Sequence, residues 1–134
     1  MAITKSELLQ VRTEHDIVLA RQAVRRLAQE LGFGLVDQTK IVTAASELAR
    51  NTVIYGGGGT LTCECLLEGA RKGLRLTFKD EGPDIPDLEL ALTDGWTSGS
   101  GMGLGLSGTK RLVNDFEIDS AAGRGTRVTV ARWK

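Results

Sequence analysis

The sequence has little cysteine, little proline, few aromatic residues and no excess of charge of either sign. Its 17 basic side chains balance 17 acidic ones, so the formal net charge is zero. A neutral chain gives no electrostatic reason to expect nucleic acid as a partner. No apolar stretch approaches the roughly 20 residues that a membrane-spanning helix needs, and the N-terminal stretch lacks the apolar core of a signal peptide. We therefore expect a cytoplasmic protein that has no membrane partner.

The two cysteines, Cys63 and Cys65, form a C-x-C pair. Such a pair supplies too few ligands for a structural zinc site, and residues this close within one strand rarely reach disulfide geometry. Leu61, Cys63, Cys65 and Leu67 alternate with polar Thr62 and Glu64. This period of two predicts a half-buried strand in which the cysteines act as small apolar residues.

A chain of 134 residues has the size of one domain, and neither a linker nor an internal repeat divides it. We expect a single domain covering residues 1–134. The patterns predict strands at 6–12, 60–68, 74–80, 117–121 and 126–133, helices at 13–31, 37–55 and 104–115, and a loop at 81–103 with a short helix at 86–92. This order predicts an α+β fold, a two-layer sandwich with helices on one face of a mixed, mostly antiparallel sheet.

The second predicted helix contains two polar residues one turn apart. Glu47 and Asn51 are four residues apart and are therefore neighbours on one face. The apolar stripe of the helix lies a third to half a turn away. A carboxylate can accept a proton, and an amide oxygen is a hard ligand that suits Mg²⁺. Taken alone, this spacing is also typical of two ordinary solvated side chains.

A carboxylate ends the strand predicted at 74–80. Asp80 shares a face with Leu74, Leu76 and Phe78, because side chains alternate along a strand. A carboxylate at the end of an apolar row is costly unless a donor satisfies it, and the exocyclic amine of adenine would be a suitable donor. An aspartate that has already turned to water fits the same pattern equally well.

Glycines are dense from residue 99 to residue 105, just before a predicted helix. Glycine lets backbone N–H groups approach a phosphate closely, and a helix N-terminus favours anions, although a flexible loop has the same composition. The G-x-G-x-x-G at 103–108 follows no strand, which excludes a Rossmann site, and no P-loop motif is present. Further on, Thr126 shares a face with Val128 and Val130, where a tolerated β-former is the simpler interpretation.

The order of these segments is more specific than any one of them. E-x-x-x-N, D-x-G-x-x-I-P, G-x-G-x-G-L and G-x-G-T follow one another. This order resembles the N box and the three glycine boxes of the GHKL ATPase and kinase superfamily, whose ATP-binding domain has the Bergerat fold. The resemblance runs from about Thr13 to the end. Within the superfamily, residues 14–22, 30–38, 46–51 and 110–112 are most similar to the serine/threonine switch-protein kinases of the bacterial stressosome.

The resemblance implies ATP and Mg²⁺ as cofactors and gives individual residues a role. Glu47 would accept the proton of the attacking serine or threonine hydroxyl, and Asn51 would hold the Mg²⁺. Asp80 would accept the adenine amine, and Gly82 would let the base approach. The remaining nucleotide-binding residues implied are Ile85, Gly101, Gly103, Leu104, Gly105 and Thr126. No Lys or Arg occurs between Lys79 and Lys110, so this loop brings no cation to the phosphates and a slow enzyme is expected.

The resemblance also implies partners. The substrates would be STAS-domain proteins, namely RsbS-like antagonists and RsbR-like co-antagonists, and the released kinase would activate a PPM-type phosphatase by direct contact. An exposed group of arginines on the first two helices could dock an acidic partner, although solvated helix faces look the same. These arginines are Arg21, Arg25, Arg26 and Arg50.

The same sequence allows three other interpretations. An anti-sigma-factor kinase of the same superfamily would bind a sigma factor as well as a STAS protein. A histidine kinase catalytic domain is disfavoured, because the only histidine, His15, lies at a predicted helix start and no dimerisation helix is present. A binding module with a decayed ATP site is suggested by Asp84, which stands where the first glycine box usually has glycine. The presence of Glu47, Asn51 and Asp80 argues against decay.

Overall fold

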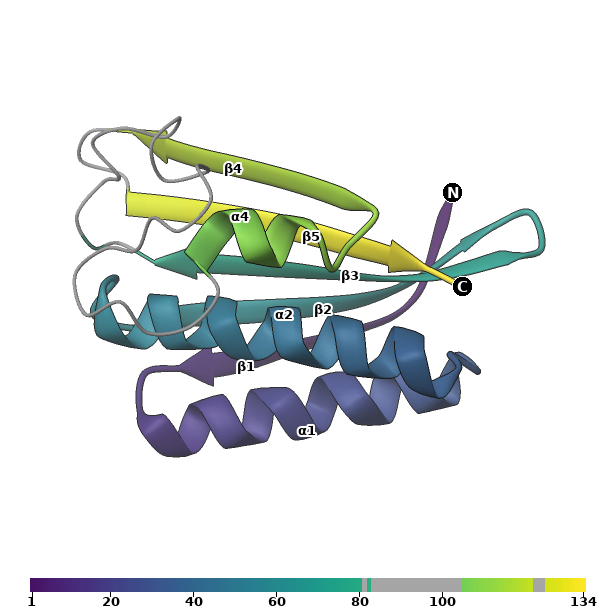
Figure 1. The fold of residues 1–134 in the computed structure, drawn as a ribbon, viewed down its shortest axis with the longest axis horizontal. Coiled ribbons are helices and arrows are strands. Elements are labelled where there is room, and N and C mark those ends of the chain that lie inside the picture. Colours follow the sequence, from purple (N-terminus) through teal and green to yellow (C-terminus); the bar gives the residue numbers. More distant parts are fainter. Residues whose placement is uncertain (81, 83–104, 122–124) are drawn as a thin grey trace.

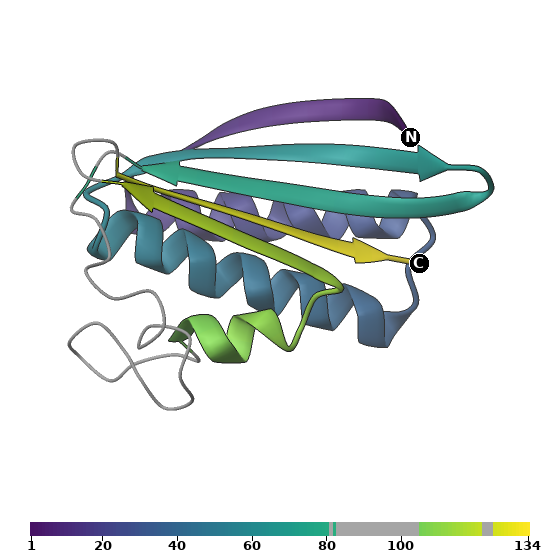
Figure 2. The ribbon, with the colours of Figure 1, turned by 90° about the horizontal axis from the view of Figure 1, so that it is seen from above.

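The protein is described by a computed structural model that covers residues 1–80, 82, 105–121 and 125–134. Within these residues, three helices lie on one face of a five-stranded sheet, as Figure 1 shows from the front and Figure 2 from above. The elements are β1 (Ala2–Val11), α1 (Glu14–Glu30), α2 (Leu35–Ile54), β2 (Gly59–Glu68), β3 (Arg71–Asp80), α4 (Gly105–Lys110), β4 (Asp115–Ala121) and β5 (Gly125–Trp133).

The strand order in the sheet is β1-β2-β3-β5-β4, so that the last strand of the chain lies between β3 and β4. Every neighbouring pair of described strands is antiparallel. The two-layer α+β fold expected from the sequence is therefore confirmed. The crossover matters for function, because it places the start of β5 beside the end of β3.

The core lies between the sheet and the helices. Apolar residues of α1 and α2 face the inner side of the central strands, in the spacing that an amphipathic helix requires. The largest fully buried side chains include Leu27, Ile41, Leu48, Leu61, Leu74, Leu76, Phe78 and Val130. Among the described residues no helix is long and apolar enough to cross a membrane.

The start of α1 has a capping box. Asp16 N donates to Thr13 Oγ1 at 3.2 Å, and Thr13 N donates to Asp16 Oδ2 at 3.2 Å. Arg12 N also donates to this carboxylate, at 2.9 Å, and these backbone donors hold the pKa of Asp16 below its usual value. A reciprocal cap of this kind satisfies backbone donors that the first helical turn leaves without a partner.

Two element boundaries differ most from the prediction. β1 begins at Ala2 rather than near Ser6, and Ala2 pairs with Leu67 of β2. Leu8 lies on the exposed face of this edge strand, whereas Leu9 and Val11 face the helices. α4 ends at Lys110 rather than near residue 115, because Leu112 N closes a turn onto Thr109 O and Asn114 N already pairs with Ala131 O of the sheet. The short helix expected at 86–92 lies outside the described residues.

The cysteine pair is structural, as expected. Cys63 and Cys65 are both free and buried on the inner face of β2. Burial away from water raises the pKa of the Cys63 thiol to about 12, so this thiol carries almost no negative charge near neutral pH. The alternation breaks at the end of the strand, where Leu66 is buried and Leu67 is half-buried.

Candidate functional site

Glu47 and Asn51 lie together on one side of helix α2, apart from its apolar stripe. Both side chains are half-buried, whereas the apolar stripe predicted for this helix is buried throughout. That stripe consists of Ile41, Ala45, Leu48, Ala49 and Thr52. Thr52 Oγ1 donates to Leu48 O at 2.8 Å, so a hydroxyl in the stripe is satisfied within the helix. The two polar residues therefore lie beside the core contact of α2 and outside it.

The C-terminal end of α2 is built from glycine. Tyr55 N and Gly56 N both donate to Asn51 O, at 3.0 and 3.1 Å, and Gly58 N donates to Thr52 O at 2.8 Å. Gly57 and Gly58 have φ angles of +72° and +103°, which residues with a side chain rarely adopt. The helix therefore ends in a hydrogen-bonded glycine turn less than two turns beyond Asn51, and the chain enters β2 at once.

Asp80 lies at the point where β3 meets this turn. Gly82 N donates to Asp80 Oδ1 at 2.9 Å. A Cβ atom placed on Gly56 would lie only 2.5 Å from Asp80 Cγ, and a Cβ on Gly82 would overlap the backbone of Gly56. Asp80, Gly82 and the end of α2 are thus packed so closely that neither Gly56 nor Gly82 has room for a side chain. Sequence analysis missed Gly56, although four consecutive glycines were a visible signal.

The start of β5 completes this corner of the molecule. Lys79 of β3 pairs with Arg127 of β5, and one further step in the same antiparallel register places Asp80 beside Thr126. On its other side, Asp80 pairs with Gly59 of β2. Thr126 is buried on the face of Val128 and Val130, as predicted, and its hydroxyl lies 3.2 Å from Ser120 Oγ. Asp80 and Thr126 are therefore neighbours on the helix-facing side of the sheet.

These positions suit a nucleotide. A half-buried carboxylate at the end of the apolar row of β3 can accept a hydrogen bond from an exocyclic amine, as can a neighbouring threonine hydroxyl. The described residues contain no group of three or more His, Cys, Asp and Glu that could hold a metal ion alone. A single amide oxygen from Asn51 fits Mg²⁺ that takes its other ligands from phosphate and water, which is its usual preference.

Several predicted site residues lie outside the described part of the chain. These are Ile85, Gly101, Gly103 and Leu104, together with Asp84, the residue that suggested a decayed site. Gly105 is the first residue of α4, which lies beside α2. The structure thus brings Asp80, Gly82 and Thr126 together next to the helix that carries Glu47 and Asn51.

Comparisons with known proteins point in the same direction. Residues 36–134 match the family described as histidine kinase-, DNA gyrase B-, and HSP90-like ATPase. The chain is 46% identical over 125 residues to serine/threonine-protein kinase RsbT of Bacillus subtilis, covering 93% of this chain and 94% of that protein. It is 30% identical over 120 residues to an anti-sigma F factor of Bacillus licheniformis, covering 84% of this chain and 81% of that protein.

Solved structures share the fold. A crystal structure of RsbU and RsbW domains from Mycobacterium tuberculosis superposes with a TM-score of 0.66 at 23% identity, covering 98% of this chain and 33% of that one. The mycobacterial sensor histidine kinase MprB gives a TM-score of 0.56 at 19% identity, covering 96% of this chain and 97% of that one.

Proposed function

Because the chain belongs to the histidine kinase-, DNA gyrase B-, and HSP90-like ATPase family, we propose that it is an ATP-dependent serine/threonine protein kinase of a bacterial partner switch. The observation that carries the proposal is the 46% identity to serine/threonine-protein kinase RsbT over nearly the whole of both chains. The placement of Asp80 beside Thr126 and against the end of α2 supports it, since two positions predicted from the sequence, Asp80 and Thr126, meet at one corner of the sheet.

Each residue of the site has a role in this proposal. Asp80 accepts a hydrogen bond from the adenine amine, and Thr126 lies at the same end of the base. Asn51 holds Mg²⁺, which would neutralise charge on the phosphates when it is bound. Ile85, Gly101, Gly103, Leu104 and Gly105 complete the nucleotide site.

Glu47 carries the proton in the transfer step. The serine or threonine hydroxyl oxygen forms a bond to the γ-phosphorus, and the bond from that phosphorus to the β–γ bridging oxygen breaks. The hydroxyl proton passes to the Glu47 carboxylate, and ADP leaves. Since positioning and charge neutralisation dominate phosphoryl transfer, a site whose glycine segment has no basic residue should turn over below the roughly 1–100 s⁻¹ of protein kinases.

The finer part of the proposal concerns partners and location. We propose RsbS-like and RsbR-like STAS-domain proteins as the substrates, a PPM-type phosphatase as the protein activated by contact, and the cytoplasm as the place of action. The relatives that support partner switching include the anti-sigma F factors. An anti-sigma-factor kinase is therefore the second candidate, and binding of a sigma factor by the purified chain would favour it.

The experiment is single-turnover transfer of labelled γ-phosphate from ATP to a purified RsbS-like STAS-domain protein. Glu47→Gln should slow transfer by about 10²- to 10⁴-fold, the usual contribution of a general base, without weakening nucleotide binding. Glu68→Gln, an exposed glutamate at the far end of β2, is the matched control. Undiminished transfer by Glu47→Gln would refute the role of Glu47. Nucleotide binding without any transfer by the native chain would leave a module that acts by contact alone.

A further inference from the structure

Arg50 of α2 carries an unsatisfied polar atom. Among the described residues, its Nε is the one buried side-chain nitrogen or oxygen without a hydrogen-bond partner. The sequence predicted an exposed side chain here, as for Arg21, Arg25 and Arg26. Those three are exposed, whereas Arg50 is half-buried, so the prediction was wrong for Arg50 alone. A charged donor that has lost water and gained no acceptor is costly, which indicates an acceptor that the isolated chain does not supply.

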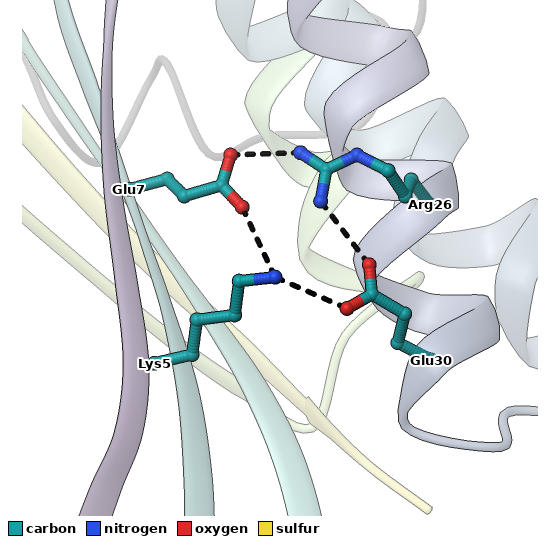
Figure 3. A network of polar contacts seen from close by, with 4 residues as sticks. All are labelled: Lys5, Glu7, Arg26 and Glu30. Carbon is teal, nitrogen blue, oxygen red and sulfur yellow. Dashed lines mark hydrogen bonds and ion pairs between the residues drawn. The ribbon is translucent and has the colours of Figure 1, made fainter.

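Arg26 of α1 shows how an arginine of the same layer is satisfied within the molecule (Figure 3). Its Nη2 lies 2.7 Å from Glu7 Oε1, and its Nη1 lies 3.1 Å from Glu30 Oε2. Lys5 Nζ closes a ring of four charges, at 3.1 Å from Glu30 Oε1 and 3.7 Å from Glu7 Oε2. Arg26 therefore needs no external acceptor and provides a matched control for Arg50.

The position of Arg50 on α2 indicates what its acceptor is. At about 100° of rotation per residue, Glu47 lies about 40° around the helix from Asn51, and Arg50 lies about 60° further in the same direction. The proposed base therefore lies between the proposed magnesium ligand and Arg50. The hydroxyl that attacks the γ-phosphorus gives its proton to Glu47, so the γ-phosphoryl group has to lie close to this carboxylate. Arg50 borders that place on the side away from Asn51.

The glycine-rich segment brings no positive charge of its own to this place. No Lys or Arg occurs between Lys79 and Lys110. Negative charge is spread over the three equatorial oxygens of a phosphoryl group in transfer, and catalysis depends on stabilising it. A planar guanidinium suits this task, because it can donate two parallel hydrogen bonds to phosphate oxygens. An unsatisfied arginine beside the proposed base can supply the cation that the segment lacks.

We propose that Arg50 is a further catalytic residue, which binds the γ-phosphate of ATP and so distinguishes ATP from ADP. The Nε–H that has no acceptor among the described residues donates to a γ-phosphate oxygen. Arg50 then holds the γ-phosphoryl group from one side of Glu47, while Asn51, with its Mg²⁺, holds it from the other. This inference rests on the proposed kinase function and names the residue that recognises the transferred group.

The first test observes Arg50 directly and needs no protein substrate. In the ¹⁵N-arginine-labelled full chain, the Nε–Hε signals of Arg50 and Arg26 are assigned by their loss in Arg50→Lys and Arg26→Lys. A non-hydrolysable ATP analogue with Mg²⁺ should shift the Arg50 signal, and ADP with Mg²⁺ should leave it in place. The Arg26 signal should move with neither nucleotide. An equal shift with ADP, or no shift of Arg50 with the bound analogue, overturns the proposal.

The second test measures the preference for the third phosphate. Arg50→Gln should weaken binding of the ATP analogue by about 10- to 100-fold, as expected for a hydrogen bond between charged groups, and should change ADP affinity by less than about twofold. Arg26→Gln removes the same charge from a paired arginine and should leave both affinities at the native values. Equal losses for the two nucleotides in Arg50→Gln would mean that this arginine does not recognise the γ-phosphate.

The third test concerns the transfer step. In single-turnover transfer to an RsbS-like STAS-domain protein, Arg50→Gln should be slower by about 10³-fold or more at saturating ATP, the lower end of the range for an arginine that stabilises a phosphoryl group in transfer. Arg50→Lys keeps the charge without the planar fork and should recover part of the rate. A native rate in Arg50→Gln would contradict the catalytic role.

The two proposals fail in different ways. If the native chain binds the ATP analogue and shifts the Arg50 signal but phosphorylates no STAS-domain protein, the kinase proposal is wrong and the γ-phosphate contact stands. If phosphorylation proceeds and Arg50→Gln keeps the native rate and the native preference for ATP over ADP, the Arg50 proposal is wrong and the kinase proposal stands.

Discussion

The two ends of the sheet are held together by different kinds of contact. At the end where the chain terminates, side chains bridge the elements: Arg132 donates to Asp37 Oδ1 at 2.6 and 3.1 Å and to Leu112 O at 3.0 Å. Trp133 Nε1 donates to Asp115 Oδ2 at 3.0 Å. At the opposite end, Asp80 is fitted between glycines and backbone. One end thus uses side chains for cohesion, while the other uses close backbone packing that leaves a carboxylate beside the proposed nucleotide site.

The largest expected effect comes from a substitution at the end of the sheet that carries the proposed nucleotide site, and this substitution leaves the contacts at the opposite end unchanged. Asp80→Asn keeps an acceptor oxygen for Gly82 N but also presents an amide donor to the adenine amine. We expect its affinity for a fluorescent ATP analogue in Mg²⁺ to fall by about 100-fold, the upper range for a hydrogen bond to a charged group. The free energy of unfolding should change by less than about 1 kcal/mol, since the packing against Gly56 is kept.

Asp115→Asn is the control for Asp80→Asn, because it makes the same change at the opposite end of the sheet. Its affinity for the ATP analogue should equal that of the native chain. If the two variants lose affinity equally, or if Asp80→Asn binds like the native chain, the adenine is not recognised by Asp80.

The next effect in size concerns the end of the sheet where the chain terminates. In Arg132→Met, Asp37 and Leu112 O lose a partner that is largely buried, with 14% of the Arg132 side chain exposed. We expect the free energy of unfolding to fall by about 1–3 kcal/mol in urea denaturation, because a partly buried carboxylate is left without its cation. Nucleotide affinity of the folded variant should not change, since the contact lies at the end of the sheet remote from Asp80.

Arg127→Met provides the comparison for Arg132→Met. Its pair with Asp119 is longer, at 3.5 Å, and both side chains are 57% exposed. Exposed pairs of this kind contribute little, so its unfolding free energy should stay within about 0.5 kcal/mol of the native value. Equal destabilisation by both variants would show that burial of the Arg132 pair is not what stabilises this end.

Local pattern predicted most of the fold and part of the site. The long helices and the central strands have strong apolar periods, and the faces assigned to Asp80 and Thr126 follow from alternation along β3 and β5. The start of β1 was missed because this edge strand is exposed on both faces there, which leaves no pattern of burial. The end of α4 was missed because Leu112 and Val113 continue the apolar period beyond the helix.

Contacts between distant segments could not be predicted in the same way. The neighbourhood of Asp80 and Thr126 depends on the insertion of β5 between β3 and β4, and the fit of Gly56 against Asp80 depends on where α2 ends. Nothing in the local sequence of Arg50 distinguishes it from a solvated arginine, and its burial is visible only in the folded chain. The catalytic role of Glu47 and the magnesium role of Asn51 remain predictions.

The smallest expected effect concerns a closed ring of four charged side chains that ties α1 to β1. It consists of Lys5, Glu7, Arg26 and Glu30. The hydrogen bond from Arg26 is the main cause that holds the pKa of Glu7 below its ordinary value near 4.5. A carboxylate whose pKa is lowered on folding stabilises the protein above its unfolded-state pKa, and this stabilisation is lost as the pH falls through the folded-state pKa.

Glu7→Gln should therefore unfold at a slightly lower temperature than the native chain at pH 7, and the difference should vanish as the pH falls below the ordinary glutamate range. Raising the salt concentration at pH 7 should shrink the same difference, because the other three charges of the ring, on Lys5, Arg26 and Glu30, are solvent-exposed and screened. Thermal melts of both proteins across pH and salt measure it. A difference that persists in acid and in high salt would mean that Glu7 stabilises β1 by packing and not through the ring.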